Sequence, residues 1–175
     1  RNLVRVFLLQ ERLKANKNVE GFDPQNVHVI GAGIMGGDIA AWCALQGMTV
    51  AIQDREPRFI APAIQRAYKL FMRRLKHPRL VRGVMDRLMP DITATNVGKA
   101  DIIIEAIIEN LSIKKDLYKK IDEIMREDLV ISSNTSTIPI KLLSEGLSKK
   151  FKKNFLITHF FNPPRYLKLL EIVKS

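Results

Sequence analysis

The sequence predicts an α/β protein with a doubly wound, mostly parallel β-sheet. Three observations support this prediction. Short apolar segments typical of buried strands alternate with longer segments of helical periodicity. The strand segments are apolar throughout, as in parallel sheets that helices cover on both faces. A glycine cluster separates the first strand from the first helix, and an acidic residue follows the second strand.

The expected elements follow one another in the order that such a fold requires. We expect strands at residues 27–31, 49–53, 92–95, 100–106, 129–132, 154–159 and 167–174. We expect helices at residues 33–46, 58–76, 80–89, 111–126 and 136–147, with Gly47 and Pro90 marking two helix ends. In the helix at 111–126, the lysines should face outward, and the inward residues should be Leu111, Leu117, Ile121 and Ile124.

Residues 1–24 are expected to form a separate N-terminal helix and linker. Apolar and basic residues alternate at roughly helical spacing between residues 2 and 14. The stretch that follows is polar and contains Gly21 and Pro24, as linkers do. Because the sequence begins with Arg1 rather than Met, we expect a fragment of a larger protein, in which residues 25–175 form one domain.

Composition limits the possible classes of function. The chain has 175 residues, of which 46% are hydrophobic and 27% charged, as in soluble globular domains. No apolar run approaches the ~20 residues of a membrane span. The single cysteine, Cys43, cannot form an internal disulfide, which favours a reducing compartment. The scattered histidines provide no metal-ligand spacing, so no metal site is expected.

The net charge of +11 is concentrated between residues 55 and 89. The basic residues there are Arg55, Arg58, Arg66, Lys69, Arg73, Arg74, Lys76, Arg79, Arg82 and Arg87. Such a segment could bind nucleic acid, bind a polyphosphate ligand such as a nucleotide or coenzyme A, or form solvated helix faces. No nucleic-acid motif accompanies it, so nucleic acid ranks last.

The glycine cluster has the pattern of a dinucleotide-binding turn. Gly31, Gly33 and Gly36 match G-x-G-x-x-G between a buried strand and a helix. These glycines allow a tight turn, close approach of a pyrophosphate, and close packing of helix on sheet, while the helix N-terminus offers N–H groups to phosphate. Asp54 ends the second strand about 20 residues later, where an acceptor for a ribose 2′-hydroxyl is expected. We predict a Rossmann-type domain that prefers NAD to NADP, because a carboxylate repels a 2′-phosphate.

Polar side chains after the later strands are candidates for chemistry. The run from Ser132 to Ser136 either faces the cofactor crevice or forms a turn and helix cap. His159 ends one apolar strand and Glu171 lies within another, so pairing of the strands would bring them together. A buried glutamate needs such a partner, and a glutamate-supported histidine is the general base that alcohol oxidation by NAD requires. The alternative for His159 is a satisfied core residue.

Together these motifs resemble the NAD-binding domain of 3-hydroxyacyl-CoA dehydrogenases of fatty-acid β-oxidation. The resemblance runs from Val27 to the last residue. It includes GAGIMG at 31–36, Asp54, EAIIEN at 105–110, SNTS at 133–136, HFFNP at 159–163 and LE at 170–171. More loosely, the N-terminal segment resembles the connection between hydratase and dehydrogenase domains in the alpha subunits of multifunctional fatty-acid oxidation complexes.

The resemblance implies NAD-dependent oxidation of (S)-3-hydroxyacyl-CoA to 3-ketoacyl-CoA. It implies that His159 is the catalytic base, Glu171 its electrostatic partner, and Ser136 a contact to substrate and cofactor. The implied NAD site is lined by Gly31, Gly33, Ile34, Met35, Gly36, Asp54, Ile107, Ile108, Glu109, Lys114, Ser136 and Asn162. Coenzyme A contacts are implied only as a region, about Arg66 to Arg82. For Glu109 and Lys114, a helix-capping acid with a solvated lysine is the plainer alternative.

The resemblance also implies partners and compartments. The partners are a hydratase domain and a C-terminal helical domain of the same polypeptide, a thiolase subunit, and a second copy of the protein. The compartment is the bacterial cytoplasm, the mitochondrial matrix or a peroxisome.

Three departures from the family pattern bear on these expectations. Asp38 replaces a glycine, residues 164–167 replace a smaller and more apolar stretch, and the helical domain does not follow Ser175. We therefore expect this fragment to bind NAD with little turnover. Two alternatives stay open: a Rossmann dehydrogenase of small hydroxy acids, which would use a lysine on a later helix, and a non-catalytic NAD-binding relative.

Overall fold

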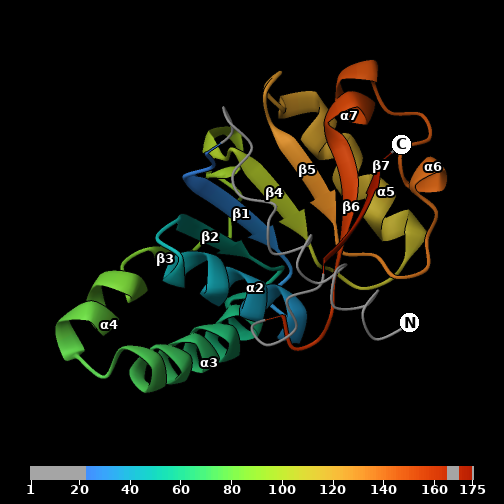
Figure 1. Cartoon of the computed structure of the whole chain (residues 1–175). Helices are drawn as coiled ribbons and strands as arrows, with labels where there is room; N and C mark the ends of the chain where they lie inside the picture. The colour runs from blue at the N-terminus through green and yellow to red at the C-terminus, as the bar shows by residue number, and fades with distance from the viewer. Residues whose placement is uncertain (1–22, 165–169, 175) are drawn as a thin grey trace, which may run out of the picture.

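The computed structural model describes residues 23–164 and 170–174, which form a seven-stranded sheet in the order β3-β2-β1-β4-β5-β6-β7 (Figure 1). The strands are β1 (Asn26–Ile30), β2 (Thr49–Gln53), β3 (Leu88–Pro90), β4 (Ile102–Glu105), β5 (Val130–Ser133), β6 (Phe155–Phe160) and β7 (Leu170–Lys174). Strands β1 to β6 are parallel, and β7 runs antiparallel to β6. The predicted Rossmann-type, doubly wound and mostly parallel sheet is confirmed.

Helices cover both faces of the sheet. They are α2 (Ile34–Leu45), α3 (Pro57–Leu75), α4 (Pro78–Met85), α5 (Leu111–Ile124), α6 (Ile140–Leu143) and α7 (Lys149–Asn154), with a 3₁₀ turn η1 at Val97–Lys99. Helices α2, α3 and α4 bury one cluster around Val29 and Phe71, and α5, α6 and α7 bury another around Ile103 and Phe151. The two clusters lie on opposite faces because alternate strand residues point to opposite sides. The α3–α4 hairpin extends from the sheet at the lower left of Figure 1.

The predicted ends of the first helix and the nature of its cysteine agree with the structure. Gly47 adopts a positive φ of 104° directly after the residue that caps α2, where a glycine is favoured. Cys43 packs against the cluster on the α2 side, and burial raises the pKa of its thiol to about 11. This cysteine is therefore a structural, unreactive thiol.

The strand predicted at residues 92–95 is wrong. The third strand lies earlier, at β3, where Leu88 pairs with Val50. Pro90 is tolerated there because β3 is an edge strand of the described sheet, so the N–H that proline lacks is not required for pairing with a second strand. The residues after β3 form a turn instead, because the Asp91 carboxylate accepts hydrogen bonds from the backbone N–H groups of Thr95 and Asn96. The helix predicted at 80–89 is accordingly shorter and earlier, at α4.

The predicted inward face of α5 is confirmed for Leu111, Leu117 and Ile121, which belong to or pack against the cluster on this side. It is wrong for Ile124, and the expectation that every lysine faces outward is wrong for Lys114. Lys114 and Tyr118 are fully buried, whereas Ile124 is 57% exposed. The buried face follows Lys114, Tyr118 and Ile121, at helical spacings of four and three. A polar network described below explains why a lysine can occupy this face.

Two further segments differ from expectation. Within the predicted helix at 136–147 only α6 is helical, and α7 was not predicted. Ser148 caps α7 by accepting a hydrogen bond from the N–H of Phe151. Residues 1–22, with the predicted N-terminal helix, and residues 165–169 lie outside the described part of the chain. In the part that is described, no helix is both long and apolar enough to cross a bilayer.

Candidate cofactor and catalytic site

The predicted site residues gather at the carboxyl end of the parallel strands. Strand β1 lies between β2 and β4, so the chain connection reverses direction at this point of the sheet. Ligands of doubly wound sheets bind in the crevice at such a reversal. The glycine loop after β1, Asp54 after β2 and residues 106–110 after β4 all border this crevice.

The three positions of the loop are occupied by glycine for different structural reasons. Gly31 has a φ of +108°, and a Cβ there would lie 2.5 Å from the carbonyl oxygen of Ala106. A Cβ on Gly36 would overlap the carbonyl oxygen of Gly31. A Cβ on Gly33, by contrast, would meet nothing within 4 Å. Nothing inside the described protein therefore requires glycine at position 33, and the open space in front of it fits a ligand that approaches the backbone.

The N-terminus of α2 fits a phosphate group. Among the described residues no side chain caps α2, as none caps α3, α4 or α6. The first-turn N–H groups of α2 are therefore available, and the helix dipole favours an anion there. Asp38, where the resemblance implied a glycine, is only 7% exposed and so presents little of its carboxylate to a ligand.

Asp54 lies directly beside the glycine loop. Its Oδ2 accepts a hydrogen bond of 2.7 Å from the N–H of Ala32, and its Oδ1 accepts one of 2.7 Å from the N–H of Arg55. These bonds fix the carboxylate at the tip of β2, and each oxygen keeps a lone pair for a ribose hydroxyl. The loop, the uncapped helix and this acceptor together fit a dinucleotide.

The remaining predicted cofactor residues lie around the same crevice. Ile34 and Ile108 are 64% and 68% exposed, which is high for apolar side chains and fits a surface that a ligand covers. Met35 is half-buried on α2, and Ile107 packs against the cluster on the α5 side. Asn162 is exposed in the turn after β6.

His159 and Glu171 face each other across the β6–β7 pair, as predicted. His159 Nδ1 lies 2.8 Å from Oε2 of Glu171, and His159 Nε2 lies 3.1 Å from Oγ of Ser136. Because a carboxylate only accepts, the ring proton is assigned to Nδ1, which leaves the Nε2 lone pair as a base. The ring also packs edge-on against Phe161, with centroids 5.1 Å apart. These three contacts fix the imidazole's orientation.

The reason for the His159–Glu171 pairing differs from the one predicted. The Glu171 side chain is 57% exposed, so burial does not force its carboxylate to find a partner. The antiparallel register of β6 and β7 places the two side chains opposite each other instead. Glu171 therefore acts by orienting the ring and by its charge.

The polar run from Ser132 to Ser136 divides between the two alternatives left open above: Ser136 lies beside His159, and the Thr135 hydroxyl accepts a turn hydrogen bond from the N–H of Ile138. Ser132 and Ser133 are fully buried, so the expectation that they face the crevice is wrong. Ser132 bonds to Thr158 on the neighbouring strand, and Ser133 donates a 2.7 Å hydrogen bond to Glu105. Of this run only Ser136, which is exposed, contacts His159.

A buried network centred on Glu105 supports this edge of the site. Its Oε1 accepts hydrogen bonds from Nζ of Lys114 at 2.7 Å and from the N–H of Ile107 at 2.8 Å. Its Oε2 accepts from the hydroxyl of Tyr118 at 2.5 Å and from that of Ser133. Burial and the negative charge of Glu105 raise the pKa of Tyr118, which stays a donor at any relevant pH. Sequence reasoning missed Tyr118, although it stands one helical turn after Lys114.

Glu109 connects this network to the backbone of Ser136. It accepts hydrogen bonds from the Thr135 hydroxyl at 2.6 Å and from the N–H groups of Ser136 and Thr137, each at 3.1 Å. Its Oε2 lies 3.4 Å from Nζ of Lys114. Partial burial alone would raise the pKa of Glu109, but these hydrogen bonds and the charge of Lys114 outweigh it and lower the pKa to about 2. Glu109 thus holds the backbone that carries Ser136.

The prediction that Lys114 faces the crevice is wrong, and so is the alternative that it is solvated. Its side chain has no exposed surface and lies between Glu105 and Glu109. In this conformation it cannot contact a ligand directly. It acts on the site through Glu109.

Replacing Lys114 with methionine should strongly destabilise the domain. The change leaves Glu105 buried without its counter-ion, which typically costs about 3–5 kcal/mol. Urea unfolding of the full-length protein measures this. The matched control is Lys115→Met, because Lys115 pairs with the exposed Glu145 at 2.8 Å and such pairs contribute about 1 kcal/mol or less. Equal effects of the two changes would contradict a structural role for the buried pair.

Replacing Glu109 with glutamine should reduce acid sensitivity. The pKa of Glu109 in the folded state, about 2, lies below its ordinary value of 4.5. The stabilisation from this group is therefore complete above pH 4.5 and is lost as the pH falls from 4.5 towards 2. The wild-type advantage in urea midpoint over Glu109→Gln should shrink over this range, relative to the exposed change Glu123→Gln. An advantage that is constant with pH would contradict the prediction.

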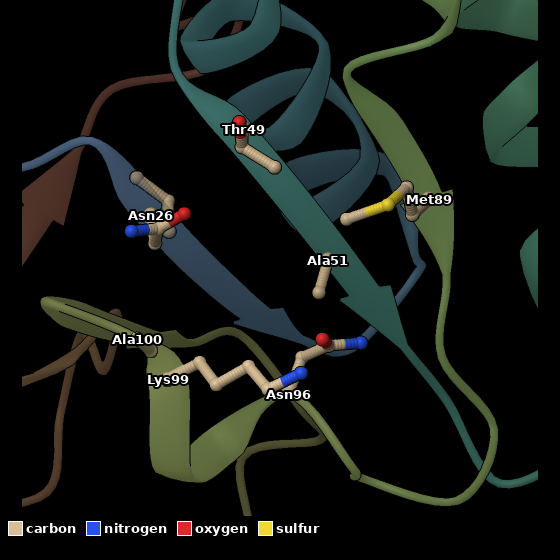
Figure 2. A pocket seen from close by; sticks show the side chains of 8 residues that line it. Asn26, Thr49, Ala51, Met89, Asn96, Lys99 and Ala100 are labelled. Carbon is tan, nitrogen blue, oxygen red and sulfur yellow. The ribbon is translucent and has the colours of Figure 1, made fainter.

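A pocket lies against the face of β1, β2 and β3 that the connection between β3 and β4 crosses (Figure 2). It has a volume of about 190 Å³ and is lined by Asn26, Val27, Thr49, Ala51, Met89, Asn96, Lys99 and Ala100. Its lining extends from Asn26 and Thr49, the first residues of β1 and β2, to Ala51 within β2 and Asn96 in that connection. The amides of Asn26 and Asn96 already donate to Asp101 and Asp91. The pocket contains none of the predicted site residues.

A dinucleotide cradle beside a histidine–glutamate pair defines the class of nicotinamide-dependent dehydrogenases. The chain belongs to the 3-hydroxyacyl-CoA dehydrogenase family, whose NAD-binding domain it matches over residues 26–175. Its cofactor is NAD.

Solved structures agree with this family. The chain is 28% identical to 3-hydroxybutyryl-CoA dehydrogenase from Escherichia coli, with a TM-score of 0.80, over 86% of this chain and 32% of that one. It is 30% identical to (S)-3-hydroxybutyryl-CoA dehydrogenase from Ralstonia eutropha, with a TM-score of 0.78, over 86% and 54%. The dehydrogenase part of multifunctional enzyme 1 from C. elegans shares the fold at 22% identity, with a TM-score of 0.76, over 97% and 42%. The chain therefore spans about a third to a half of these proteins.

Proposed function

We propose that the full-length protein oxidises (S)-3-hydroxyacyl-CoA to 3-ketoacyl-CoA with NAD in fatty-acid β-oxidation, and that this chain supplies the NAD-binding half. The observation that carries the proposal is the oriented base. His159 Nε2 lies 3.1 Å from Ser136 Oγ, and Glu171 holds the opposite ring nitrogen at 2.8 Å. This arrangement stands at the strand ends that border the dinucleotide cradle.

Each residue has a distinct role in this proposal. NAD, when bound, supplies the acceptor for the hydride that leaves the substrate carbon. His159 Nε2 accepts the proton of the substrate hydroxyl, and Glu171 stabilises the imidazolium that results. The Ser136 hydroxyl can donate and accept, so it orients the substrate oxygen towards Nε2. Glu109 keeps Ser136 in place.

The context of the full-length protein is also a proposal. The relatives named above are longer than this chain, and β7 exposes the apolar residues Leu170, Ile172 and Val173. Both facts support a C-terminal helical domain that covers this strand and completes the acyl pocket. The other proposed partners are a hydratase domain preceding residue 25, a thiolase subunit and a second copy. The proposed compartment is a reducing one: bacterial cytoplasm, mitochondrial matrix or peroxisome.

The test is an assay of the full-length protein in the reverse direction. Acetoacetyl-CoA should support oxidation of NADH, followed at 340 nm, whereas acetoacetate without coenzyme A should support little. Equal rates with both would favour a dehydrogenase of small hydroxy acids. Tight NADH binding with no turnover of either would favour a non-catalytic relative. Either result would overturn the proposal.

A further inference from the structure

Gly37 is a glycine that the dinucleotide pattern leaves unexplained. It follows Gly36 and lies in the first turn of α2, on the side that packs against α3. A Cβ there would lie 2.9 Å from Cβ of Ala63 and 2.9 Å from Nη2 of Arg66. Real Cβ atoms are almost never so close to other atoms. The missing side chain therefore makes room for α3 and for one guanidinium.

The guanidinium of Arg66 uses this room to reach the glycine loop. Its Nη2 donates a 2.9 Å hydrogen bond to the carbonyl oxygen of Gly33. The same oxygen accepts the helical hydrogen bond from the N–H of Gly37 at 3.0 Å. The Nε of Arg66 is buried and has no hydrogen-bond partner among the described residues. The hydrogen bond to Gly33 therefore holds the guanidinium in place, although burying Nε without a partner costs free energy.

Arg66 differs from the other basic residues of the α3–α4 hairpin. Arg73, for example, is exposed and donates only to the carbonyl of Lys69 in its own helix. Arg74 stacks over Trp42 at 5.7 Å from the ring centre. Arg66 is the residue of the basic segment that contacts the loop between β1 and α2.

The hydrogen bond from Arg66 acts on the Gly33–Ile34 peptide, which we expect to contact the pyrophosphate. In a trans peptide the C=O of Gly33 and the N–H of Ile34 point in opposite directions. A cation that fixes this C=O on the α3 side therefore fixes the N–H on the open side in front of Gly33. A charged donor on the oxygen also polarises the amide and strengthens its N–H as a donor.

We propose that Arg66 is a positioning residue of the pyrophosphate site. The missing side chain of Gly37, which lets α3 approach at Ala63, also leaves room for Arg66 to reach Gly33. The proposal rests on the NAD-binding part of the proposed function and not on the reaction. Arg66 acts through the Gly33–Ile34 peptide, so its contribution concerns the pyrophosphate of the ligand and not its adenosine.

The test compares ligands with and without a pyrophosphate in the full-length protein. Arg66→Met should weaken NAD and ADP-ribose about tenfold, or about 1.4 kcal/mol, because the Gly33–Ile34 peptide loses the cation that orients and polarises it. Adenosine affinity should change less than about twofold. Arg66→Lys should recover part of the loss, since it restores the charge without the planar fork. Gly37→Ala should weaken NAD as well, because its Cβ displaces the guanidinium.

Two controls separate this role from charge and from folding. Arg73→Met removes the same charge from the same helix and should leave NAD affinity within about twofold. Gly83→Ala places a Cβ in open space on α4 and should have no effect. The proposal fails if Arg73→Met weakens NAD as much as Arg66→Met, if adenosine weakens in parallel, or if Arg66→Met binds NAD like the wild type. Hydroxyacyl-CoA turnover plays no part in these outcomes, so they are independent of the proposed reaction.

Discussion

His159→Ala in the full-length protein is expected to lower kcat for acetoacetyl-CoA reduction by about 10³-fold and to leave the Kd for NAD within about twofold. General acid–base catalysis by a positioned side chain typically contributes 10²–10⁴-fold. The imidazole bonds to Ser136 and Glu171 and lies outside the glycine loop, so its loss should spare the cofactor. Stopped-flow measurement of NADH oxidation and calorimetry with NAD give the two quantities.

The control for this change is Lys120→Ala. Lys120 is exposed on α5, outside the region implied to contact coenzyme A, and its replacement should be neutral. Glu171→Gln should lie between the two, because the amide keeps the hydrogen-bonding geometry but removes the charge that stabilises the imidazolium. Retention of more than about a tenth of the activity by His159→Ala would rule out the histidine as the base.

Gly33→Ala should weaken NAD binding without changing stability, whereas Gly36→Ala should lower the stability of the domain. A Cβ on Gly33 projects into open space, and the φ of −61° suits alanine, so the stability of the domain should not change. The methyl group would, however, occupy the approach of the pyrophosphate, and NAD affinity should fall on the order of 10- to 100-fold, or about 1.4–2.8 kcal/mol. A Cβ on Gly36 overlaps the Gly31 carbonyl and should cost about 1–3 kcal/mol of stability through overpacking.

Thermal unfolding and NAD calorimetry on both variants check this division. Gly98→Ala is the matched control, since its Cβ also meets nothing within 4 Å and η1 lies away from the carboxyl ends of the strands. The account would be wrong about Gly33 if the alanine variant bound NAD normally. It would be wrong about Gly36 if that variant unfolded at the wild-type temperature.

Most of the fold could be predicted from the sequence because the signals were strong and local. Apolar runs, the glycine turn and Gly47 mark β1, α2 and β2 without reference to distant residues. The pairing of His159 with Glu171 was also predictable, because the turn-forming Asn162, Pro163 and Pro164 stand between two apolar runs and favour their pairing. The pairing does not depend on burial of Glu171, since the backbone register of β6 and β7 places the two residues opposite each other.

The errors arose where distant polar groups override local pattern. Lys114 looked solvated on charge alone, yet Glu105 and Tyr118 make its burial possible, and only the tertiary structure brings Glu105 beneath α5. The third strand was misplaced because Asp91 organises the following turn through side-chain hydrogen bonds that no periodicity reveals. The contact of Arg66 with Gly33 joins residues 33 positions apart and gave no local signal.

In the proposed reaction a substrate hydroxyl meets His159 beside NAD bound on the glycine loop. This is tested with the full-length protein, NAD and (S)-3-hydroxybutyryl-CoA carrying deuterium at C3, with mass spectrometry of the products. We expect deuterium on the reduced nicotinamide, one equivalent of acetoacetyl-CoA, and formation of both products about 10³-fold more slowly with His159→Ala. Unlabelled NADH, or the same labelled products at an undiminished rate with His159→Ala, would contradict it.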